Sequence, residues 1–305
     1  MIDSASAPTQ QLGKSGWLHG PLDEGFSYSI RSSQLLCHHE TDHQNIEVHS
    51  TPSFGNLLRT DGSFMAGEKD EFFYHENLVH VPANAHALQS ALIIGGGDGG
   101  SAKELLKHST IQSIKLVEID QIVVDVSRTY LRKVNHGVMD IQGGDSRLEI
   151  FIADGLEYKQ NSMAMYDLII LDLTDPGGPS QPLYAASFYQ HCAARLKPGG
   201  LLSLQVASPF AQPERVVSTL TATSQVFRIV SPYLVTIPLS DGQWMMACAL
   251  QTVDPKHLAS SQTDQVILDR GLHHLQHYNG HTCQAVMALP NFVLDMIKTT
   301  GAKLT

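Results

Sequence analysis

Two aspartates close together in the chain have the spacing and setting of catalytic residues. Asp172 and Asp175 follow an uninterrupted apolar run at 168–171 and precede the stiff segment Pro-Gly-Gly-Pro at 176–179. Such a run is typical of a strand buried on both faces, and open α/β sheets bind ligands at the carboxyl ends of these strands. A carboxylate there can accept a proton or bind a cation. Aspartate is also a common turn and N-cap residue, so the pair alone leaves an active site and a capped turn equally open.

The elements needed to position these aspartates alternate along the chain. Strand patterns at 91–94, 114–119, 148–152, 168–171 and 201–206 are separated by helix patterns at 101–108, 121–131, 155–161 and 183–196. The segment Lys-Pro-Gly-Gly at 197–200 is a helix stop followed by a tight turn. Alternation of this kind predicts an α/β fold with a Rossmann-like, doubly wound, mostly parallel sheet of the methyltransferase type.

The remaining chain predicts a second, smaller unit. Residues 1–16 are small and polar, and we expect a disordered tail. Short β-type segments between 26 and 73 predict a small N-terminal antiparallel β domain, and 70–88 a helix and linker interrupted by Pro82. We therefore divide the chain into a tail at 1–16, a β-strand domain at 17–85 and a catalytic domain at 86–305. Strands at 234–237 and 243–250 and a helical region complete the last domain.

The predicted strand ends carry the groups of a nucleoside site. A glycine-rich turn begins at Gly95, Glu118 ends the second strand, and Asp154 follows the third. Glu118 is placed to accept hydrogen bonds from ribose hydroxyls, and Asp154 from an adenine amine. The glycine spacing also matches a dinucleotide fingerprint. However, Asp98 within the turn disfavours a pyrophosphate or an amino-acid carboxylate and favours an ammonium group. The crevice therefore predicts an adenosyl compound with a cationic tail.

The bulk properties indicate a soluble enzyme of the cytoplasm. The 305 residues carry a formal net charge of −10 with no basic cluster, which disfavours nucleic acid as a partner. No apolar run approaches the roughly 18 residues of a membrane span, and the N-terminus lacks the pattern of a signal peptide. The four cysteines are far apart, against a disulfide framework or a thiolate metal site. Four histidines at 273, 274, 277 and 281 have helical spacing, and we interpret them as a solvated helix face rather than a metal site.

Several segments, in order, resemble the spermidine synthases (polyamine aminopropyltransferases). The resemblance covers nearly the whole chain and is carried by residues 16–17, 34–44, 70–76, 92–100, 117–120, 172–179, 278–279 and 288–290. It implies transfer of an aminopropyl group from decarboxylated S-adenosylmethionine to an amine, commonly putrescine, with release of methylthioadenosine. It also implies a homodimer or higher homo-oligomer and no cofactor or metal beyond the adenosyl co-substrate.

The resemblance assigns roles to residues along the crevice. On the nucleoside side it implies Gln44, Gly95, Asp98, Glu118, Asp154, Gly155 and Pro179. On the amine side it implies Tyr74, His75, Asp98, Asp172, Asp175 and Gln205. Asp172 would be the catalytic base, because an ammonium of pKa near 10.4 must lose a proton before its nitrogen can attack carbon.

Two departures from the family pattern fall on the amine side. Gln205 is followed by Val-Ala-Ser at 206–208, without the acidic or amide residue usual in the family. The loop at 237–242 is one residue shorter than the family's Pro-Thr-Tyr loop and lacks its tyrosine. Asp241 in that loop is either a turn residue or a substitute acidic contact. Putrescine is the first expected acceptor, with agmatine, cadaverine or a longer polyamine as alternatives.

Three other classes of protein share parts of the pattern. An S-adenosylmethionine-dependent methyltransferase shares the sheet and the glutamate for ribose, but Asp98 opposes the carboxylated donor. A binding protein without turnover is disfavoured because Tyr74, Asp172 and Asp175 are all present. A nicotinamide oxidoreductase is disfavoured because Asp98 lies where pyrophosphate would bind.

Overall fold

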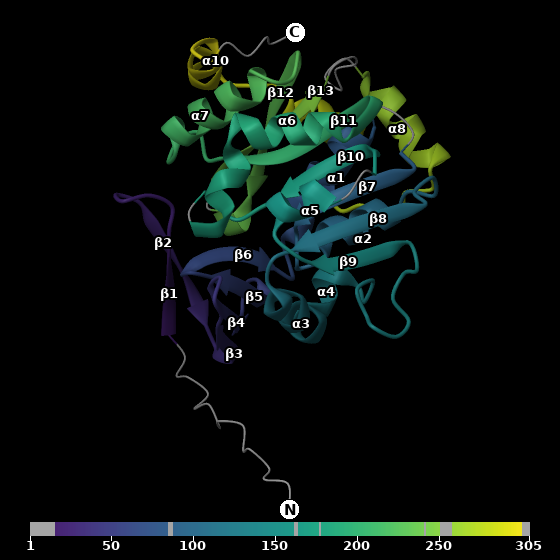
Figure 1. Cartoon of the computed structure of the whole chain (residues 1–305). Coiled ribbons are helices and arrows are strands. Elements are labelled where there is room, and N and C mark those ends of the chain that lie inside the picture. Colours follow the sequence, from purple (N-terminus) through teal and green to yellow (C-terminus); the bar gives the residue numbers. More distant parts are fainter. Residues whose placement is uncertain are drawn as a thin grey trace, which may run out of the picture.

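A seven-stranded sheet forms the centre of the protein (Figure 1). The computed structural model describes residues 16–84, 88–161, 164–176, 178–240, 242–250 and 258–300. The strands of the central sheet are β7 (Ser90–Gly95), β8 (Ser113–Glu118), β9 (Leu148–Ile152), β10 (Tyr166–Asp172), β11 (Leu196–Ala207), β12 (Ile229–Ile237) and β13 (Gly242–Leu250). Their order is β12-β13-β11-β10-β7-β8-β9, with β7 to β11 parallel and β13 antiparallel to both its neighbours. The predicted Rossmann-like fold is confirmed.

The helices follow the strands along the chain. They are α1 (Glu71–Ala83), α2 (Gly100–Leu106), α3 (Gln121–Tyr130), α4 (Arg132–Asn135), α5 (Gly155–Asn161), α6 (Ala186–Ala194), α7 (Pro213–Ser224), α8 (Ser260–Asp269), α9 (Gly280–Val286) and α10 (Asn291–Lys298), with 3₁₀ turns η1 (Gly178–Tyr184) and η2 (Pro238–Ser240). Within the described ranges, no helix is both long and apolar enough to cross a bilayer.

The N-terminal strands form two small antiparallel sheets rather than the single one predicted. A hairpin joins β1 (Gly16–Pro21) to β2 (Ser27–Ser32). A four-stranded sheet contains β3 (Gln34–Glu40), β4 (Asn45–Thr51), β5 (Gly55–Thr60) and β6 (Ser63–Gly67). In Figure 1 these purple and blue strands lie together beside the large sheet. The predicted N-terminal tail lies outside the described residues except for Gly16, which begins β1.

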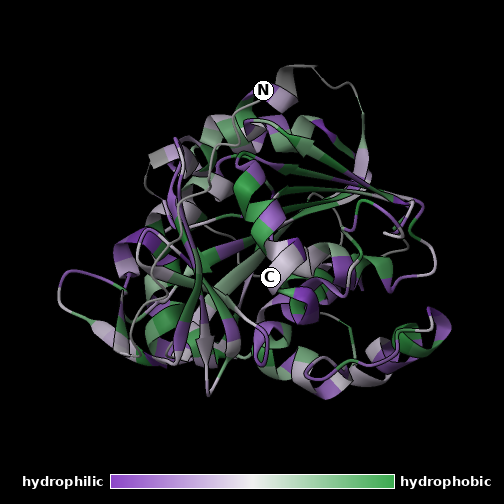
Figure 2. Cartoon of the chain, turned by 90° about the horizontal axis from the view of Figure 1, so that it is seen from below, coloured by the Kyte–Doolittle hydropathy of each residue, from purple (hydrophilic) through white to green (hydrophobic). Residues whose placement is uncertain are grey.

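The central sheet is buried on both faces, as the apolar run in β10 predicts. Leu168 and Ile170 belong to one hydrophobic core, with residues of α1 and α2. Ile169 and Leu171 belong to the other, with residues of α6 and α7. Successive side chains of a strand point to opposite faces, so a strand covered on both sides is apolar at every position. Many of the helices in Figure 2 carry both hydrophobic and hydrophilic colours, as expected of helices that bury one face.

Three local predictions differ from the structure. The segment 197–200 is not a free turn but lies within β11, where Tyr166 pairs with Leu196 and Leu168 already pairs with Leu201. The extra residues form a bulge, because neighbouring strands keep the sheet together on both sides. The helix expected at 183–196 is η1 followed by α6. The histidines at 273–277 lie in the loop between α8 and α9, so their helical spacing is coincidental.

Helix α1 is held by polar contacts at its buried end. Pro82 lies inside the helix and has no N–H to donate to the carbonyl of Leu78. The hydroxyl of Ser203 on β11 donates to that carbonyl instead, at 2.7 Å. The fully buried carboxylate of Glu76 accepts hydrogen bonds of 2.7–2.8 Å from the backbone N–H groups of residues 276, 277 and 278. These contacts fix a helix whose first turns carry candidate site residues.

Candidate active site

The candidate site lies where the strand order reverses. Strands β7 and β10 are adjacent, and Gly95 is the register partner of Asp172. A cavity of about 460 Å³ opens over this point. All the predicted site residues line it, namely Gln44, Tyr74, His75, Gly95, Asp98, Glu118, Asp154, Gly155, Asp172, Asp175, Pro179 and Gln205. Open α/β sheets bind ligands at such a switch point.

Asp172 is held by two hydroxyl donors. The hydroxyl of Tyr74 on α1 donates to Oδ1 at 2.9 Å, and that of Ser101 on α2 donates to Oδ2 at 2.6 Å. Burial raises the pKa of Asp172 above its usual value, the charge of Asp98 raises it further, and His75 and the two hydroxyls oppose the shift. A carboxylate with a raised pKa, fixed at the end of a rigid strand, suits a general base.

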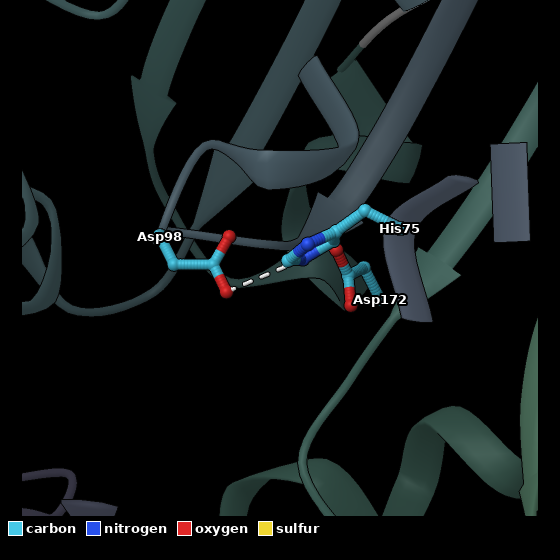
Figure 3. Close-up of side chains that lie close together, drawn as sticks. All are labelled: His75, Asp98 and Asp172. Carbon is cyan, nitrogen blue, oxygen red and sulfur yellow. Dashed lines mark ion pairs between the residues drawn. The ribbon is translucent and has the colours of Figure 1, made fainter. Parts of the chain in front are cut away.

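The imidazole of His75 contacts two carboxylates, those of Glu71 and Asp98, and Figure 3 marks its ion pair with Asp98 by a dashed line. Its Nδ1 is 2.8 Å from Oε2 of Glu71, one turn earlier in α1, and its Nε2 is 3.5 Å from Oδ2 of Asp98. Burial alone would lower the pKa of His75, but the two carboxylates raise it well above its usual value. The pKa of Asp98 is lowered by His75 against the effect of burial. Both shifts favour the ion pair of a protonated His75 with an ionised Asp98.

Glycine at two positions permits this arrangement. The backbone at Gly95 has a φ of +80°, and a Cβ there would lie 2.1 Å from the carbonyl oxygen of Asp172. A Cβ on Gly100 would lie 2.2 Å from the ring of His75. The N–H of Gly100 also donates to Oδ1 of Asp98 at 2.8 Å. The glycine-rich turn therefore lets β7 approach the backbone of Asp172 at Gly95, and lets α2 approach the His75 ring at Gly100, more closely than a larger residue would allow.

The cluster of His75, Asp98 and Asp172 also has the dimensions of a metal site. One ligand atom of each lies within 4.8 Å of the others. A metal ligand must be a neutral imidazole with an available nitrogen. The two nitrogens of His75 instead face Glu71 and Asp98, and both carboxylates favour its protonated form. The cluster therefore fits a metal ion poorly.

At the nucleoside end, Glu118 is connected to the N-terminal sheet. Burial and the neighbouring Asp120 raise the pKa of Glu118 to about 7, and the N–H of Asp120 donates to its Oε1 at 3.1 Å. Asp120 in turn accepts from the hydroxyl of Thr41 at 2.7 Å and from Nε2 of Gln44 at 3.3 Å. The small sheet therefore supplies one wall of the cavity through Gln44.

Three other residues predicted for the nucleoside, Asp154, Gly155 and Pro179, also line the cavity. Asp154 accepts the N–H of Leu156 at 2.8 Å, at the start of α5. A Cβ on Gly155 would lie 2.7 Å from Ile94, so the chain passes close to β7. Pro179 is exposed at the start of η1. Their positions around the cavity match those expected, and their roles remain predictions.

At the opposite end, the loop of the missing tyrosine contributes an apolar surface. Ile237 and Leu239 line the cavity there, and Asp241 lies outside the described residues. The N–H of Leu239 donates to Oδ2 of Asp70 at 2.8 Å, and burial raises the pKa of Asp70 to about 6. Asp175 forms an ion pair of 2.7 Å with Arg215 of α7.

Sequence reasoning missed three of the polar residues described above. Ser101 follows the glycine turn directly, so its position at the start of α2 was a usable signal. Glu71 precedes His75 by four residues on a helix, a spacing that also predicts contact. Arg215 lies 40 residues beyond Asp175, and no local pattern connects the two. Only the packing of α7 against the sheet brings them together.

An enzyme with a Rossmann-like α/β fold is the class that this fold and cavity define. A profile described as "Spermine/spermidine synthase domain" matches residues 71–259, and one described as "Spermidine synthase tetramerisation domain" matches residues 16–68. The chain belongs to the spermine/spermidine synthase family and is an aminopropyltransferase of the spermidine synthase type.

Relatives and solved structures agree with this assignment. A polyamine aminopropyltransferase of Nitrosomonas europaea is 41% identical over 278 residues, covering 91% of this chain and 84% of its own. A spermidine synthase crystallised with the transition state analogue AdoDATO has a TM-score of 0.86 and 32% identity, with 96% of this chain and 98% of that chain covered. Spermidine synthase from Thermotoga maritima gives a TM-score of 0.84 and 31% identity, with the same coverage.

Proposed function

We propose that this protein transfers the aminopropyl group of decarboxylated S-adenosylmethionine to putrescine, with Asp172 as the base. The main support for the proposal is the position of the Asp172 carboxylate. It is held by Tyr74 and Ser101 at the centre of a cavity that has Glu118 at one end and apolar side chains at the other. The related spermidine synthase in complex with the transition state analogue AdoDATO supports a group-transfer reaction in this kind of cavity.

The chemistry follows from the charges in the cavity. The acceptor enters as an ammonium ion and gives one proton to the Asp172 carboxylate. The freed lone pair forms a bond to the methylene carbon attached to the donor sulfur, while the carbon–sulfur bond breaks and its electron pair stays on sulfur. The sulfonium becomes the neutral thioether of methylthioadenosine, so no developing anion needs stabilisation. Holding nitrogen and carbon in line supplies much of the remaining acceleration.

Asp98 favours the decarboxylated donor. It is an anion held in place by the N–H of Gly100 and by His75. Because His75 is shared between Asp98 and Glu71, its charge does not cancel that of both carboxylates, so Asp98 still attracts an ammonium at the end of the aminopropyl chain and repels the α-carboxylate of S-adenosylmethionine. We therefore expect S-adenosylmethionine to bind more weakly than its decarboxylated form.

Mass spectrometry tests the proposal directly. The protein is incubated with decarboxylated S-adenosylmethionine and putrescine, and both products are identified by mass. We expect methylthioadenosine and spermidine in equal amounts. A methylated product formed from S-adenosylmethionine would instead favour a methyltransferase. Nucleoside binding without any product would indicate a binding protein.

We also propose that the protein is a homo-oligomer of the cytoplasm. The match to a tetramerisation domain over residues 16–68 supports self-association. No disulfide joins the four cysteines, all of which lie in the described ranges, and this suits a reducing compartment. Light scattering after size-exclusion chromatography measures the oligomer mass, and a monomer at micromolar concentration would contradict the first part.

A further inference from the structure

The carboxylate of Asp175, on the amine side of the cavity by the family resemblance, is already paired. Oδ1 of Asp175 lies 2.7 Å from NH1 of Arg215, and Oδ2 accepts a hydrogen bond from Nε2 of Gln212 at 3.2 Å. Both oxygens of Asp175 therefore have partners within the protein. A carboxylate in an ion pair with a guanidinium attracts a further cation much less than a lone carboxylate does.

Arg215 is fixed in this position. Its side chain is 11% exposed, and its guanidinium lies 5.4 Å from the ring centre of Tyr184 and 6.0 Å from that of Trp244. Its NH2 group also reaches the hydroxyl of Tyr184 at 3.3 Å. Two aromatic faces and an ion pair hold this arginine, unlike a surface arginine that moves freely.

The second polar group of this end, the amide of Gln205, is occupied as well. Its Nε2 donates to the carbonyl of Leu173 at 3.0 Å and to the hydroxyl of Tyr184 at 2.8 Å. Its Oε1 accepts from the indole of Trp244 at 3.0 Å, with NH2 of Arg215 at 3.4 Å. Ile237 and Leu239 form the neighbouring wall, and the carboxylate of Asp70, which also lines the cavity, accepts the N–H of Leu239 at 2.8 Å.

We propose that Arg215 is a specificity-determining residue that removes the advantage of a second ammonium group on the acceptor. The proposal rests on the proposed aminopropyl transfer and concerns the acceptor alone. The reacting amine still meets the carboxylate of Asp172. The far end of the acceptor meets a neutral Asp175–Arg215 pair and apolar side chains. Amines whose far end is uncharged or anionic are therefore used at least as well as putrescine.

Three acceptors of matched length test this. Putrescine, 4-aminobutan-1-ol and 4-aminobutyrate differ only in whether the far end is cationic, neutral or anionic. The measurement is kcat/KM for each, from methylthioadenosine release. For the unaltered protein we expect a putrescine to aminobutanol ratio of one or less. Arg215→Gln, which removes the charge and frees Asp175, should raise that ratio about tenfold.

Two further variants separate charge from shape. Arg215→Lys keeps the positive charge and should keep the ratio of the unaltered protein. Arg132→Gln removes an arginine of α4 that pairs with Asp140 and does not line the cavity, and it should leave the ratio unchanged. Thermal unfolding of each variant checks that it is folded.

The outcomes are distinct. A putrescine preference of about tenfold or more over aminobutanol in the unaltered protein overturns the role of Arg215, even if Arg215→Gln does not fold. An unchanged ratio in a folded Arg215→Gln variant also overturns it. Neither result affects the transfer reaction itself. Failure to release methylthioadenosine with any of the three amines would instead refute the proposed function, and this inference with it.

Discussion

The role of Asp172 as base has a quantitative test in the variant Asp172→Asn. Asparagine has the same shape, and its amide oxygen can still accept the hydroxyl of Tyr74, which donates to Asp172 at 2.9 Å. Its NH2 group can donate to the oxygen of Ser101. The change therefore removes the proton acceptor while preserving the geometry around it. The dissociation constant of methylthioadenosine for Asp172→Asn should stay within about threefold of that for the unaltered protein. The substitution lies away from the end of the cavity predicted to bind the nucleoside, and changes at independent sites affect each other little.

The expected loss of rate follows from the protonation of the amine. With an amine pKa of about 10.4, roughly one molecule in a thousand carries a free lone pair at pH 7.4. Without a base the variant depends on this fraction, so kcat should fall by about 10³, within the usual range for a general base. Burial and Asp98 raise the pKa of Asp172, which narrows its gap to the amine and makes it a stronger base.

The pH dependence separates this explanation from a misfolded site. Above neutral pH the unaltered protein should have a nearly constant kcat. The rate of Asp172→Asn should rise about tenfold per pH unit towards the pKa of the amine, because the free amine becomes more abundant. Methylthioadenosine release is measured from pH 7 to 9.5 at saturating donor. A variant rate that is low but independent of pH, or one close to normal, would refute the reasoning.

Three further predictions concern buried groups. Burial raises the pKa of Glu118 to about 7, and ribose hydroxyls donate hydrogen bonds to its ionised form. Calorimetry should therefore show tighter binding of methylthioadenosine at pH 8 than at pH 6. Glu118→Gln should remove this difference. Asp70 is 5% exposed with a pKa raised to about 6, so its protonated form favours the folded state and stability falls between pH 4 and 7. Asp70→Asn should raise the free energy of unfolding by up to about 3 kcal/mol at pH 8 and not at pH 4, measured in urea; equal effects at both values would contradict this. Lys103 is buried between Glu71 and Glu104, with its Nζ 2.6 and 2.9 Å from their carboxylate oxygens. Lys103→Met should therefore lower the free energy of unfolding by about 3–5 kcal/mol in the same assay. The control Lys107→Met, at a more exposed lysine that also pairs with Glu104, should lower it less.

The strand ends were predictable because each is a local pattern. An apolar run followed by a polar residue identifies a strand and its end without knowledge of the fold. Asp172, Glu118 and Asp154 were all found in this way, and alternation with helices then predicted that they share one edge. The resemblance to a family added Gln44 and His75, which come from elements before the central sheet.

The remainder depends on contacts between segments distant in the chain. The pairing of Arg215 with Asp175 needs the crossing position of α7, which periodicity does not specify. The bulge at 197–200 arises because β10 and β13 hold β11 on both sides, whereas a stop signal alone predicts a free turn. The histidines at 273–277 show the converse, since helical spacing in a short segment does not make a helix.

The hydrogen bonds of Glu76 can form only after almost the whole chain has been synthesised. This carboxylate is one residue from His75 and accepts its three hydrogen bonds from the backbone of residues 276–278, about 200 positions later. The matched synthase domain ends at residue 259, before these donors. A ribosome that has made the whole matched region has therefore still not supplied these hydrogen-bond donors, and the Glu76 carboxylate lacks them until the last part of the chain emerges. A fragment cut at residue 259 would keep every residue that lines the cavity and still lack the support beneath them.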